Sequence, residues 1–481
     1  MIHLYKFKEI NILLDVNSGA AHVVSDIVYD ILLLLQSSNR NPLTSDEKPN
    51  AEINKWEADK QSIKDILAKK YETGELDTAT SEIDTLISEG TLFAPDTPQS
   101  ITSPETRGAV IKAMCLHVAH DCNMRCAYCF ADTGGFSGER SLLPLETGKK
   151  AIDFLLEHSG SRHNLEVDFF GGEPLMNFDV VKELVHYGRE KEKGKNKNIR
   201  FTITTNGLLL DKEKEAFINE HMDNVILSID GRPEVNDKMR KTPSGKGTYE
   251  YIIENLKRFR DNREGLYYVR GTFTRNNLDF SSDVLFLADQ GFEQLSIEPV
   301  VLSNDSPLSL TEEDLPAIFS EYEALAKEYL SRRQNGQRFN FFHFMVDLKN
   351  SPCLGKRVKG CGAGDEYIAV TPEGDIYPCH QFVGGSFKMG NVLTGEFNEA
   401  LRTRFRTSNL STKPACQSCW AKYFCSGGCA ANAYNFNGDI NSPYTLACEM
   451  QKKRLECALY VYATELLASE STDPLQSDQP Q

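Results

Sequence analysis

Apolar residues in the first part of the chain follow two different spacings. Residues 2–14 and 20–24 are apolar-rich segments separated by an Asn-Ser-Gly turn, which predicts paired strands. Three segments with helical spacing follow; Ser25 caps the first, and the last ends before a short strand at 91–93. Their apolar positions are Ile27, Val28, Ile31 and Leu35, then Ile63, Ile66 and Leu67, then Ile83, Leu86 and Ile87. This order predicts a small winged-helix-like domain over residues 1–94.

After a linker at 95–107 that is rich in Pro, Ser and Thr, strand-like runs alternate with helical spacing over residues 108–335. Candidate strands lie at 113–118, 165–170, 199–205, 224–229, 267–274 and 294–300. Candidate helices lie at 145–158, 178–190, 212–220, 248–262 and 280–290. Six such units predict an α/β fold with a parallel sheet and helical crossovers. Ligands of such sheets bind at the carboxyl ends of the strands, where we look for site residues.

Charge and terminal sequences narrow the function classes. The 481 residues carry a formal charge of −16, which argues against a broad nucleic-acid-binding surface. The N-terminus lacks the basic start and apolar stretch of a signal peptide, and the richest apolar run, at 31–35, is too short to cross a membrane. We therefore expect a cytoplasmic protein that binds neither nucleic acid nor membranes. The polar tail at 468–481 is expected to be disordered.

Thirteen cysteines are unusual in a chain expected to stay in the reducing cytosol, and they are unevenly placed. Four lie at 115–129, nine lie at 353–457, and none lies between these groups. Structural thiols would scatter through apolar positions, whereas most of these surround short spacers, so we interpret them as metal ligands. Cys115 and Cys457 stand apart from the spacers and are interpreted as buried packing thiols.

Cys122, Cys126 and Cys129 form a C-x3-C-x2-C loop directly after the first predicted strand of the sheet. Three such thiolates can bind three corners of a [4Fe–4S] cluster and leave one iron without a protein ligand. Structural zinc prefers four close ligands, and the nearest other thiol lies back in the strand. The loop is therefore predicted to bind an iron–sulfur cluster with one open iron. His117 and His120, just upstream, are interpreted as ordinary strand and loop residues.

This spacing, with an aromatic residue before the last cysteine, resembles the signature of the radical S-adenosylmethionine (SAM) superfamily. The resemblance implies a partial (β/α)6 TIM-like barrel in which SAM binds the open iron and yields a deoxyadenosyl radical. Residues that end the second, third and fourth predicted strands match the family's SAM-binding positions, and a basic residue downstream would meet the SAM carboxylate. By this resemblance the cofactor-binding residues are Tyr128, Gly171, Gly172, Glu173, Pro174, Thr204, Asn206, Ser228, Asp230 and Arg240.

The second cysteine group, within residues 340–457, resembles the SPASM domain, which carries auxiliary [4Fe–4S] clusters. The resemblance implies three [4Fe–4S] clusters in all, with an outer auxiliary cluster on Cys416, Cys419, Cys425 and Cys448 and an inner one on Cys361, Cys379 and Cys429. Fully ligated relatives have a further cysteine shortly after the position of Cys361, which this sequence lacks. Either Cys353 supplies the fourth thiolate, or the inner cluster keeps an open iron that binds a substrate thiolate. We favour the open iron.

His380 follows Cys379, where sulfatase-maturating relatives have an acidic residue, and we predict that it acts as a base; the alternative is a surface histidine. Residues 1–94 resemble the leader-recognition domains of enzymes that mature ribosomal peptides. Segments 13–20 and 370–382 extend the resemblance to the SCIFF peptide maturases, which implies an intramolecular thioether from a substrate cysteine to a threonine. The expected partners are a ribosomal precursor peptide, bound through its leader, and a reductant such as flavodoxin or ferredoxin.

Two other functions stay open on the sequence. A sulfatase-maturating enzyme, which converts cysteine or serine to formylglycine, would share the barrel and the cluster pattern but would not need a leader-binding domain. A non-catalytic peptide-binding module stabilised by zinc could use the same paired cysteines. That module predicts zinc in place of iron and no cleavage of SAM.

Overall fold

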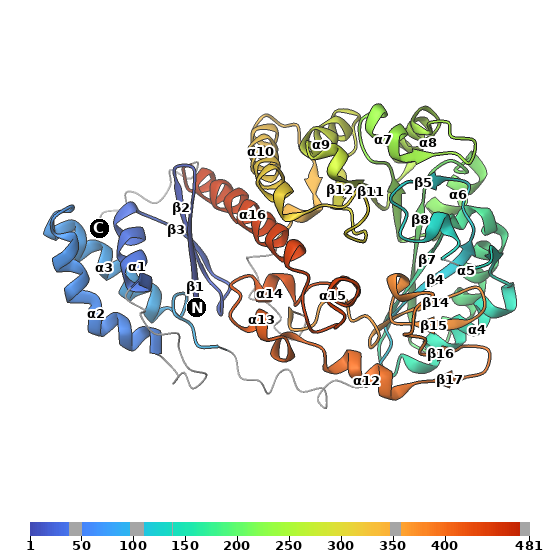
Figure 1. The fold of residues 1–481 in the computed structure, drawn as a ribbon, viewed down its shortest axis with the longest axis horizontal. Coiled ribbons are helices and arrows are strands. Elements are labelled where there is room, and N and C mark those ends of the chain that lie inside the picture. The colour runs from blue at the N-terminus through green and yellow to red at the C-terminus, as the bar shows by residue number, and fades with distance from the viewer. Residues whose placement is uncertain (38–50, 97–109, 137, 347–356, 472–481) are drawn as a thin grey trace, which may run out of the picture.

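The computed structural model describes residues 1–37, 51–96, 110–136, 138–346 and 357–471. Figure 1 shows a small domain at the N-terminal end, the long helix α16 (Thr445–Ser471) beside it, and a curved sheet with helices at the far end. The predicted start of the tail at 468 is wrong, because α16 continues to Ser471.

Three antiparallel strands and three helices build the N-terminal domain. The middle strand is β2, and the strands in order are β1 (Ile2–Phe7), β2 (Ile10–Asp15) and β3 (Ala21–Val24). The helices are α1 (Asp26–Ser37), α2 (Ala51–Leu67) and α3 (Thr73–Ser88). Segment 2–14, predicted as one strand-like segment, is two strands because Lys8 takes a left-handed φ of 52° and reverses the chain.

The ends of this domain test two local predictions. Ser25 caps α1 as predicted, since its hydroxyl accepts a hydrogen bond from the Val28 amide at 3.3 Å. The short strand predicted at 91–93 is wrong. Leu92 and Phe93 are buried, but Phe93 has a φ of 53°, which a strand does not tolerate. Their apolar character therefore reflects packing under the helices rather than sheet pairing.

A twelve-stranded sheet forms the body of the molecule. All six predicted strands occur within two residues of their expected bounds, as β4 (Ala113–His120), β7 (Asn164–Gly171), β8 (Asn198–Thr205), β9 (Asn224–Ser228), β11 (Leu266–Phe273) and β12 (Gln294–Pro299). The five predicted helices also occur, as α4 (Leu145–His158), α5 (Phe178–Glu192), α6 (Lys212–His221), α8 (Tyr249–Asn262) and α9 (Phe280–Asp289). These strands are parallel and neighbour one another in chain order, as a partial (β/α)6 barrel requires.

The C-terminal region extends this same sheet, which the sequence did not predict. Strand β14 pairs in parallel with β4, and three short strands continue antiparallel from it: β14 (Tyr367–Val370), β15 (Asp375–Tyr377), β16 (Gly390–Asn391) and β17 (Glu396–Phe397). Other short strands are β5 (Arg125–Cys126), β6 (Ser141–Leu142), β10 (Arg240–Lys241) and β13 (Asn340–Phe341). The remaining helices are α7 (Pro233–Met239), α10 (Leu315–Gln334), α12 (Glu399–Thr407), α13 (Pro414–Gln417), α14 (Lys422–Cys425) and α15 (Ala430–Asn437).

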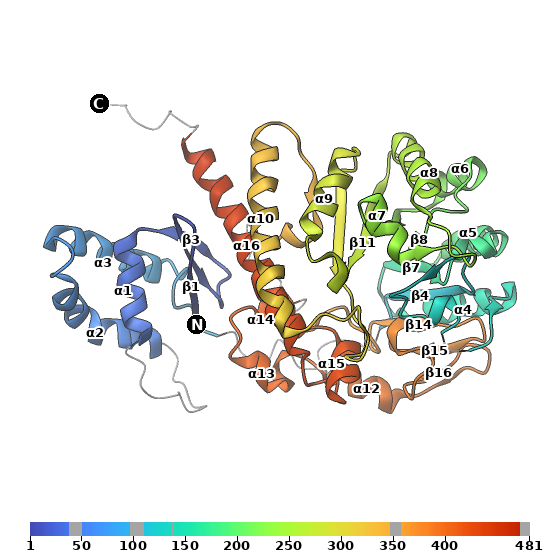
Figure 2. The same cartoon turned by 45° about the horizontal axis from the view of Figure 1, so that its top comes forward.

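Alternation along the strands decides which side chains can meet a ligand. Val167 and Phe169 of β7 are fully buried in the core that the sheet shares with the helices. Asp168 and Phe170 therefore point to the opposite face, which we call the inner face. Figures 1 and 2 show α5, α6 and α8 on the outer side of these strands. The ring of Phe170 lies 5.1 Å from that of His380, so the inner face is turned toward the C-terminal region.

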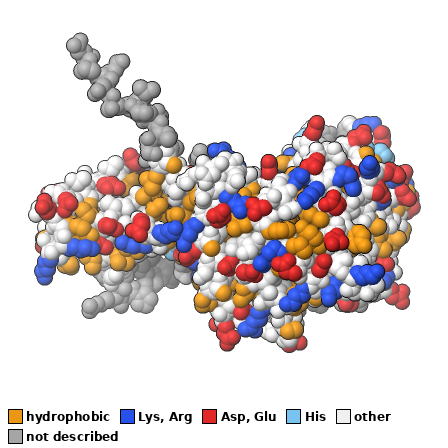
Figure 3. Space-filling view, turned by 90° about the horizontal axis from the view of Figure 1, so that it is seen from above, with side chains coloured by type: hydrophobic (Ala, Val, Ile, Leu, Met, Phe, Trp, Pro, Cys, Tyr) orange, Lys and Arg blue, Asp and Glu red, His pale blue; other side chains and the backbone are white. Residues whose placement is uncertain are grey.

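The surface carries mixed charge. Figure 3 shows acidic and basic side chains interspersed over the face seen from above, which agrees with the absence of a broad basic field in the sequence. None of the helices in the described ranges combines the length and the apolar character needed to span a bilayer.

Candidate functional site

The loop of the first cysteine group is tied down by backbone pairing. β5 pairs antiparallel with β10, so that Cys126 lies opposite Arg240, and the Ala127 amide donates to the Met239 carbonyl at 2.9 Å. Burial is the main reason why the pKa of Cys122 is raised to about 12. The thiols of Cys126 and Cys129 act in the same direction, which places all three thiols beside one another.

Two glycines let β7 approach this loop closely. A Cβ at Gly171 would lie 2.2 Å from the Ala119 carbonyl oxygen, and one at Gly172 would lie 2.1 Å from the Asp121 carbonyl oxygen. The Gly172 amide also donates to the Ala119 carbonyl at 2.8 Å. A side chain at either position would push the strand end away from the cysteine loop, which explains the need for glycine there.

Glu173 is fully buried and holds the end of β8. Its carboxylate accepts hydrogen bonds from the Thr205 hydroxyl at 2.8 Å, the Asn206 amide at 2.7 Å and the Leu175 amide at 3.0 Å. Pro174 starts the short turn that follows. The Asn206 side chain in turn donates to Asn123 at 2.8 Å and lies 3.7 Å from the Cys122 sulfur. Glu173 therefore positions Asn206 over the cysteine loop.

A second buried group joins the loop to β9. The Tyr128 hydroxyl donates to the Asp230 carboxylate, at 2.7 and 2.8 Å from its two oxygens. Arg240 donates to the Tyr128 hydroxyl at 3.2 Å and to the Ser228 carbonyl at 3.0 Å. Arg240 Nε is buried and has no partner among the described residues, so an acceptor from outside the chain would complete it. Thr204 lies on the inner side of β8 by alternation.

Four C-terminal thiols gather as the resemblance implied. Cys416 is in α13, Cys425 ends α14, and Cys448 lies in the first turn of α16. The pKa of Cys448 is raised to about 12, chiefly by burial and in part by the neighbouring thiols of Cys425, Cys416 and Cys419. The outer set is therefore assembled from three helices and the turn between them.

Three more thiols form the inner set. Burial raises the pKa of Cys379, and its neighbours Cys429 and Cys361 act in the same direction. Cys353 lies outside the described residues, so the choice between a fourth thiolate and an open iron stays a prediction. Cys115 is fully buried beside Tyr367, and its role as a packing thiol also stays a prediction.

His380 lies between the inner thiols and the cysteine loop. It follows Cys379 at the start of a short turn, and its ring lies 5.4 Å from Phe130, the residue after Cys129. Burial lowers the pKa of His380 to about 4, and the positive charge of Arg270 contributes. Upstream, His117 and His120 form a buried pair with ring nitrogens 3.0 Å apart, and His120 belongs to β4 rather than to a loop.

Sequence reasoning missed a charged group on the inner face. Glu298 of β12 lies 3.4 Å from His343, 3.6 Å from Arg454 of α16 and 4.0 Å from Arg270 of β11. Asp168 of β7 lies on the same face, and its Oδ1 atom is buried without a partner among the described residues. The sequence does hold a signal for these residues, because each is a charged residue between apolar neighbours in a predicted strand.

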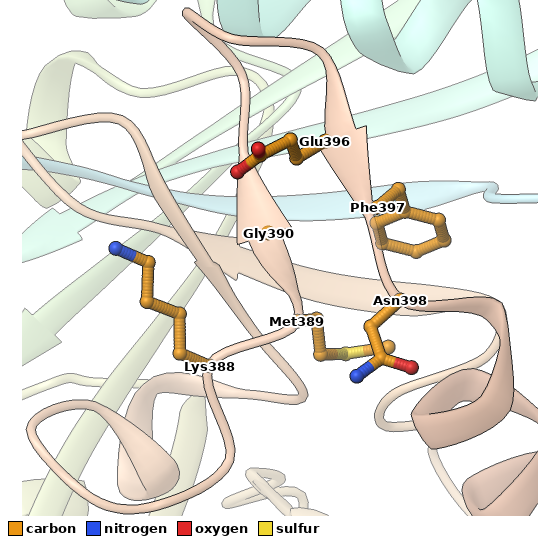
Figure 4. A pocket seen from close by; sticks show the side chains of 6 residues that line it. All are labelled: Lys388, Met389, Gly390, Glu396, Phe397 and Asn398. Carbon is orange, nitrogen blue, oxygen red and sulfur yellow. The ribbon is translucent and has the colours of Figure 1, made fainter.

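Two surface pockets of the described residues lie away from the candidate site residues. Figure 4 shows one at the β16–β17 hairpin, lined by Lys388, Met389, Gly390, Glu396, Phe397 and Asn398. A second lies beside residues 208–212 and α8. Neither is lined by a cysteine or by a predicted cofactor-binding residue.

Comparisons with known proteins agree with this geometry. Residues 116–273 match the family model of the radical SAM superfamily, and residues 361–420 match that of SPASM, an iron–sulfur cluster-binding domain. The chain carries a radical SAM domain followed by a SPASM domain. The radical SAM domain binds SAM and a [4Fe–4S] cluster, and the SPASM domain binds auxiliary iron–sulfur clusters.

The relatives cover most of the chain. A cysteine-type anaerobic sulfatase-maturating enzyme of Clostridium novyi is 27% identical over 360 residues, which are 70% of this chain and 92% of the relative. The radical SAM cyclopropyl synthase TigE of Paramaledivibacter caminithermalis is 24% identical over 361 residues, 72% of this chain and 73% of the relative. The structure of Streptococcus suis SuiB bound to its precursor peptide SuiA matches with a TM-score of 0.51 and 16% identity, over 89% of this chain and 94% of that one.

The thiol sets fit the cofactors of these two domains. Within the ranges that the structure describes, no three His, Cys, Asp or Glu side chains are arranged to hold a single metal ion. Three thiols in the first loop and two further sets in the C-terminal region provide the cysteine ligands that iron–sulfur clusters require. Which cysteine holds which cluster follows the sequence prediction and stays a proposal.

Proposed function

We propose that this chain forms an intramolecular thioether between a cysteine and a threonine of a ribosomally made, cysteine-rich (SCIFF-type) precursor peptide. The observation that carries the proposal is the N-terminal domain, whose Val16 packs in one cluster with the outer thiol Cys416 and whose sheet ends at the edge strands β1 and β3. An edge strand can receive an extended peptide as an added strand. The structure of SuiB with its precursor SuiA offers a precedent for a peptide partner.

The residues that would hold the cofactors follow from the site. Cys122, Cys126 and Cys129 would bind the first cluster; Arg240 Nε and the strand ends near Asn206 would meet SAM. Bound together, SAM and this cluster would supply the radical chemistry that takes a hydrogen atom from the acceptor carbon of the peptide, and the auxiliary clusters on the C-terminal thiols would take up the electron released when sulfur joins that carbon. The chain itself orients the peptide and excludes water from the reacting atoms.

The inner thiols and His380 would act on the sulfur side of the reaction. His380 lies between the cysteine loop and Cys379. Because its pKa is lowered to about 4, its ring is neutral near pH 7 and offers a nitrogen to the proton of a substrate thiol, as a weaker base than an ordinary histidine. The thiols of Cys361, Cys379 and Cys429 provide three ligands for the inner cluster. If Cys353 does not bind the fourth iron, a substrate thiolate would take that position. We place this activity in the cytoplasm, with a flavodoxin or ferredoxin as the electron donor.

Formation of formylglycine in a sulfatase stays the second candidate, since the Clostridium novyi relative carries that name. The test is anaerobic incubation of reduced, iron-loaded protein with SAM and a short cysteine-rich precursor peptide. Thioether formation predicts deoxyadenosine and a loss of two hydrogens per link, with no aldehyde. An aldehyde in the product, or unimpaired turnover of the full precursor after deletion of residues 1–94, would favour the second candidate.

A further inference from the structure

Two oppositely charged side chains on the inner face are not used by the function described so far. Asp168 lies between the buried Val167 and Phe169 of β7, and Arg270 follows the buried Val269 of β11. Because side chains alternate along a strand, both point away from the helices and toward the space where the two domains meet. Phe170, on the same side of β7 as Asp168, packs on His380.

Asp168 has an unused acceptor. Its Oδ1 atom is buried and makes no hydrogen bond within the described ranges. Burial raises the pKa of Asp168 to about 7, although Arg270 opposes the rise. Buried polar atoms in native proteins almost always have a partner, so this atom calls for a donor that the chain itself does not supply.

Arg270 has unused donors. Its side chain is 56% exposed, and the nearest carboxylate, that of Glu298, is 4.0 Å away. Glu298 is already shared with His343 at 3.4 Å and with Arg454 at 3.6 Å. The charge of Arg270 also acts on Asp168 and on His380, so its guanidinium extends across the inner face rather than along β11.

The two groups lie near enough for the charge of Arg270 to act on the Asp168 carboxyl, yet no ion pair joins them within the described ranges. We propose, building on the function proposed above, that Asp168 and Arg270 clamp one main-chain amide of the substrate peptide. The carboxylate accepts from the peptide N–H and the guanidinium donates to the peptide C=O. A main-chain amide carries one donor and one acceptor, which match the two groups. A substrate carboxylate or thiolate would satisfy Arg270 but would leave Asp168 without a donor.

The clamp fixes the register of the peptide at the reacting position. Asp168 precedes Phe170 by two residues on one strand, and Phe170 contacts the proposed base His380. An amide held at Asp168 and Arg270 therefore places the neighbouring peptide residues beside His380. Specificity for the acceptor position would come from main-chain register in addition to the leader.

The test measures peptide binding by anaerobic, iron-loaded protein. The probes are a short cysteine-rich precursor peptide and its leader alone, and the variants are Asp168→Ala, Arg270→Gln and the double variant. Glu264→Ala and Arg338→Gln are matched controls, because both residues are exposed and lie in loops outside β7 and β11. We expect each single variant to weaken precursor binding about tenfold, from the loss of one charged hydrogen bond. Binding of the leader alone and of both controls stays unchanged.

A set of precursors in which one backbone amide at a time is replaced by an ester identifies the contact. At one position the ester, which lacks the N–H, should weaken binding to the wild type and have no further effect in Asp168→Ala, which has no side-chain acceptor. Equal loss for precursor and leader, or no position coupled to Asp168, overturns the clamp. Turnover of the wild type separates the two proposals: if it binds through the clamp but releases no two-hydrogen-lighter product, the proposed reaction is wrong and the clamp stands.

Discussion

Replacement of Asp365 by asparagine tests how the loop after Cys361 is held. The Asp365 carboxylate pairs with Lys359 and accepts a hydrogen bond from Arg406 Nε at 2.9 Å, and Arg402 Nε lies 3.5 Å away. The side chains of Asp365 and Arg402 are only 10% and 2% exposed. One buried carboxylate therefore balances three cations, two of them on α12.

The free energy of unfolding is expected to fall because the substitution leaves these cations without their negatively charged partner. Removal of one partner from a buried ion pair costs about 3–5 kcal/mol. We expect the lower end, roughly 3 kcal/mol, because Arg402 keeps a hydrogen bond to the Asp365 carbonyl at 3.1 Å and an ion pair with Glu399 at 3.4 Å. Burial alone would raise the pKa of Asp365, but Lys359 and Arg406 lower it below its ordinary value. Its contribution is thus complete at neutral pH and is lost as the pH falls through the folded-state pKa.

The assay is urea unfolding of the anaerobic, iron-loaded protein at neutral pH, together with its iron content. Asp375→Asn is the matched control, because that carboxylate pairs at 2.6 Å with Lys388, whose side chain is 51% exposed. We expect the control to cost less than about 1 kcal/mol. Asp365→Asn should also lose about one cluster of iron per chain, since it loosens the loop that carries Cys361. Equal unfolding curves for the two variants, with full iron in both, would refute this reasoning.

Three further predictions concern other parts of the site. Asp168→Asn should raise the midpoint of thermal unfolding more at pH 8 than at pH 5, because burial raises the pKa of Asp168 to about 7 and folding is penalised once the carboxylate ionises; scanning fluorimetry across this range checks it. His380→Gln should lower the yield of crosslinked peptide at least about tenfold while deoxyadenosine still forms, as mass spectrometry of both products would show. Asp96→Asn removes the partner of Lys422 and Tyr423, so limited proteolysis should release the N-terminal domain faster.

The sheet and its crossover helices could be predicted from the sequence because their apolar residues repeat with a clear period. The six strands of the barrel are each bounded by polar or glycine-containing turns, and one face of each helix is apolar. Helix α16 was missed because apolar residues lie on all its sides, as expected for a helix buried between two bodies. The turn at Lys8 was missed because it depends on a left-handed φ at a lysine, for which no residue type gave a signal.

The residues of the candidate site also include some that the sequence predicts and some that it does not. The first thiol set was predictable because short spacers keep Cys122, Cys126 and Cys129 together in any fold. The outer and inner sets join cysteines that lie far apart in the sequence, and only the resemblance to the SPASM domain implied them; the structure brings the thiols of each set together. Asp168 and Arg270 were not predictable, because strands β7 and β11 are separated by two other strands and meet only through the curvature of the sheet. A charged residue inside an apolar strand marks an inward position but does not say what lies opposite it.

Helix α16 joins three parts of the molecule that the proposed reaction must coordinate. It begins with the outer thiol Cys448 and carries Arg454, which lies 3.6 Å from Glu298 on the inner face. Further along, Glu456 lies 3.1 Å from His3 of β1, and Tyr460 stacks on Phe7 at 4.1 Å. Since one continuous hydrogen-bonded helix cannot bend freely between these points, a peptide that docks on the N-terminal sheet as proposed would be held at a fixed distance from both the outer thiols and the inner face. The length of peptide between the leader and the modified residues would then be set by this helix.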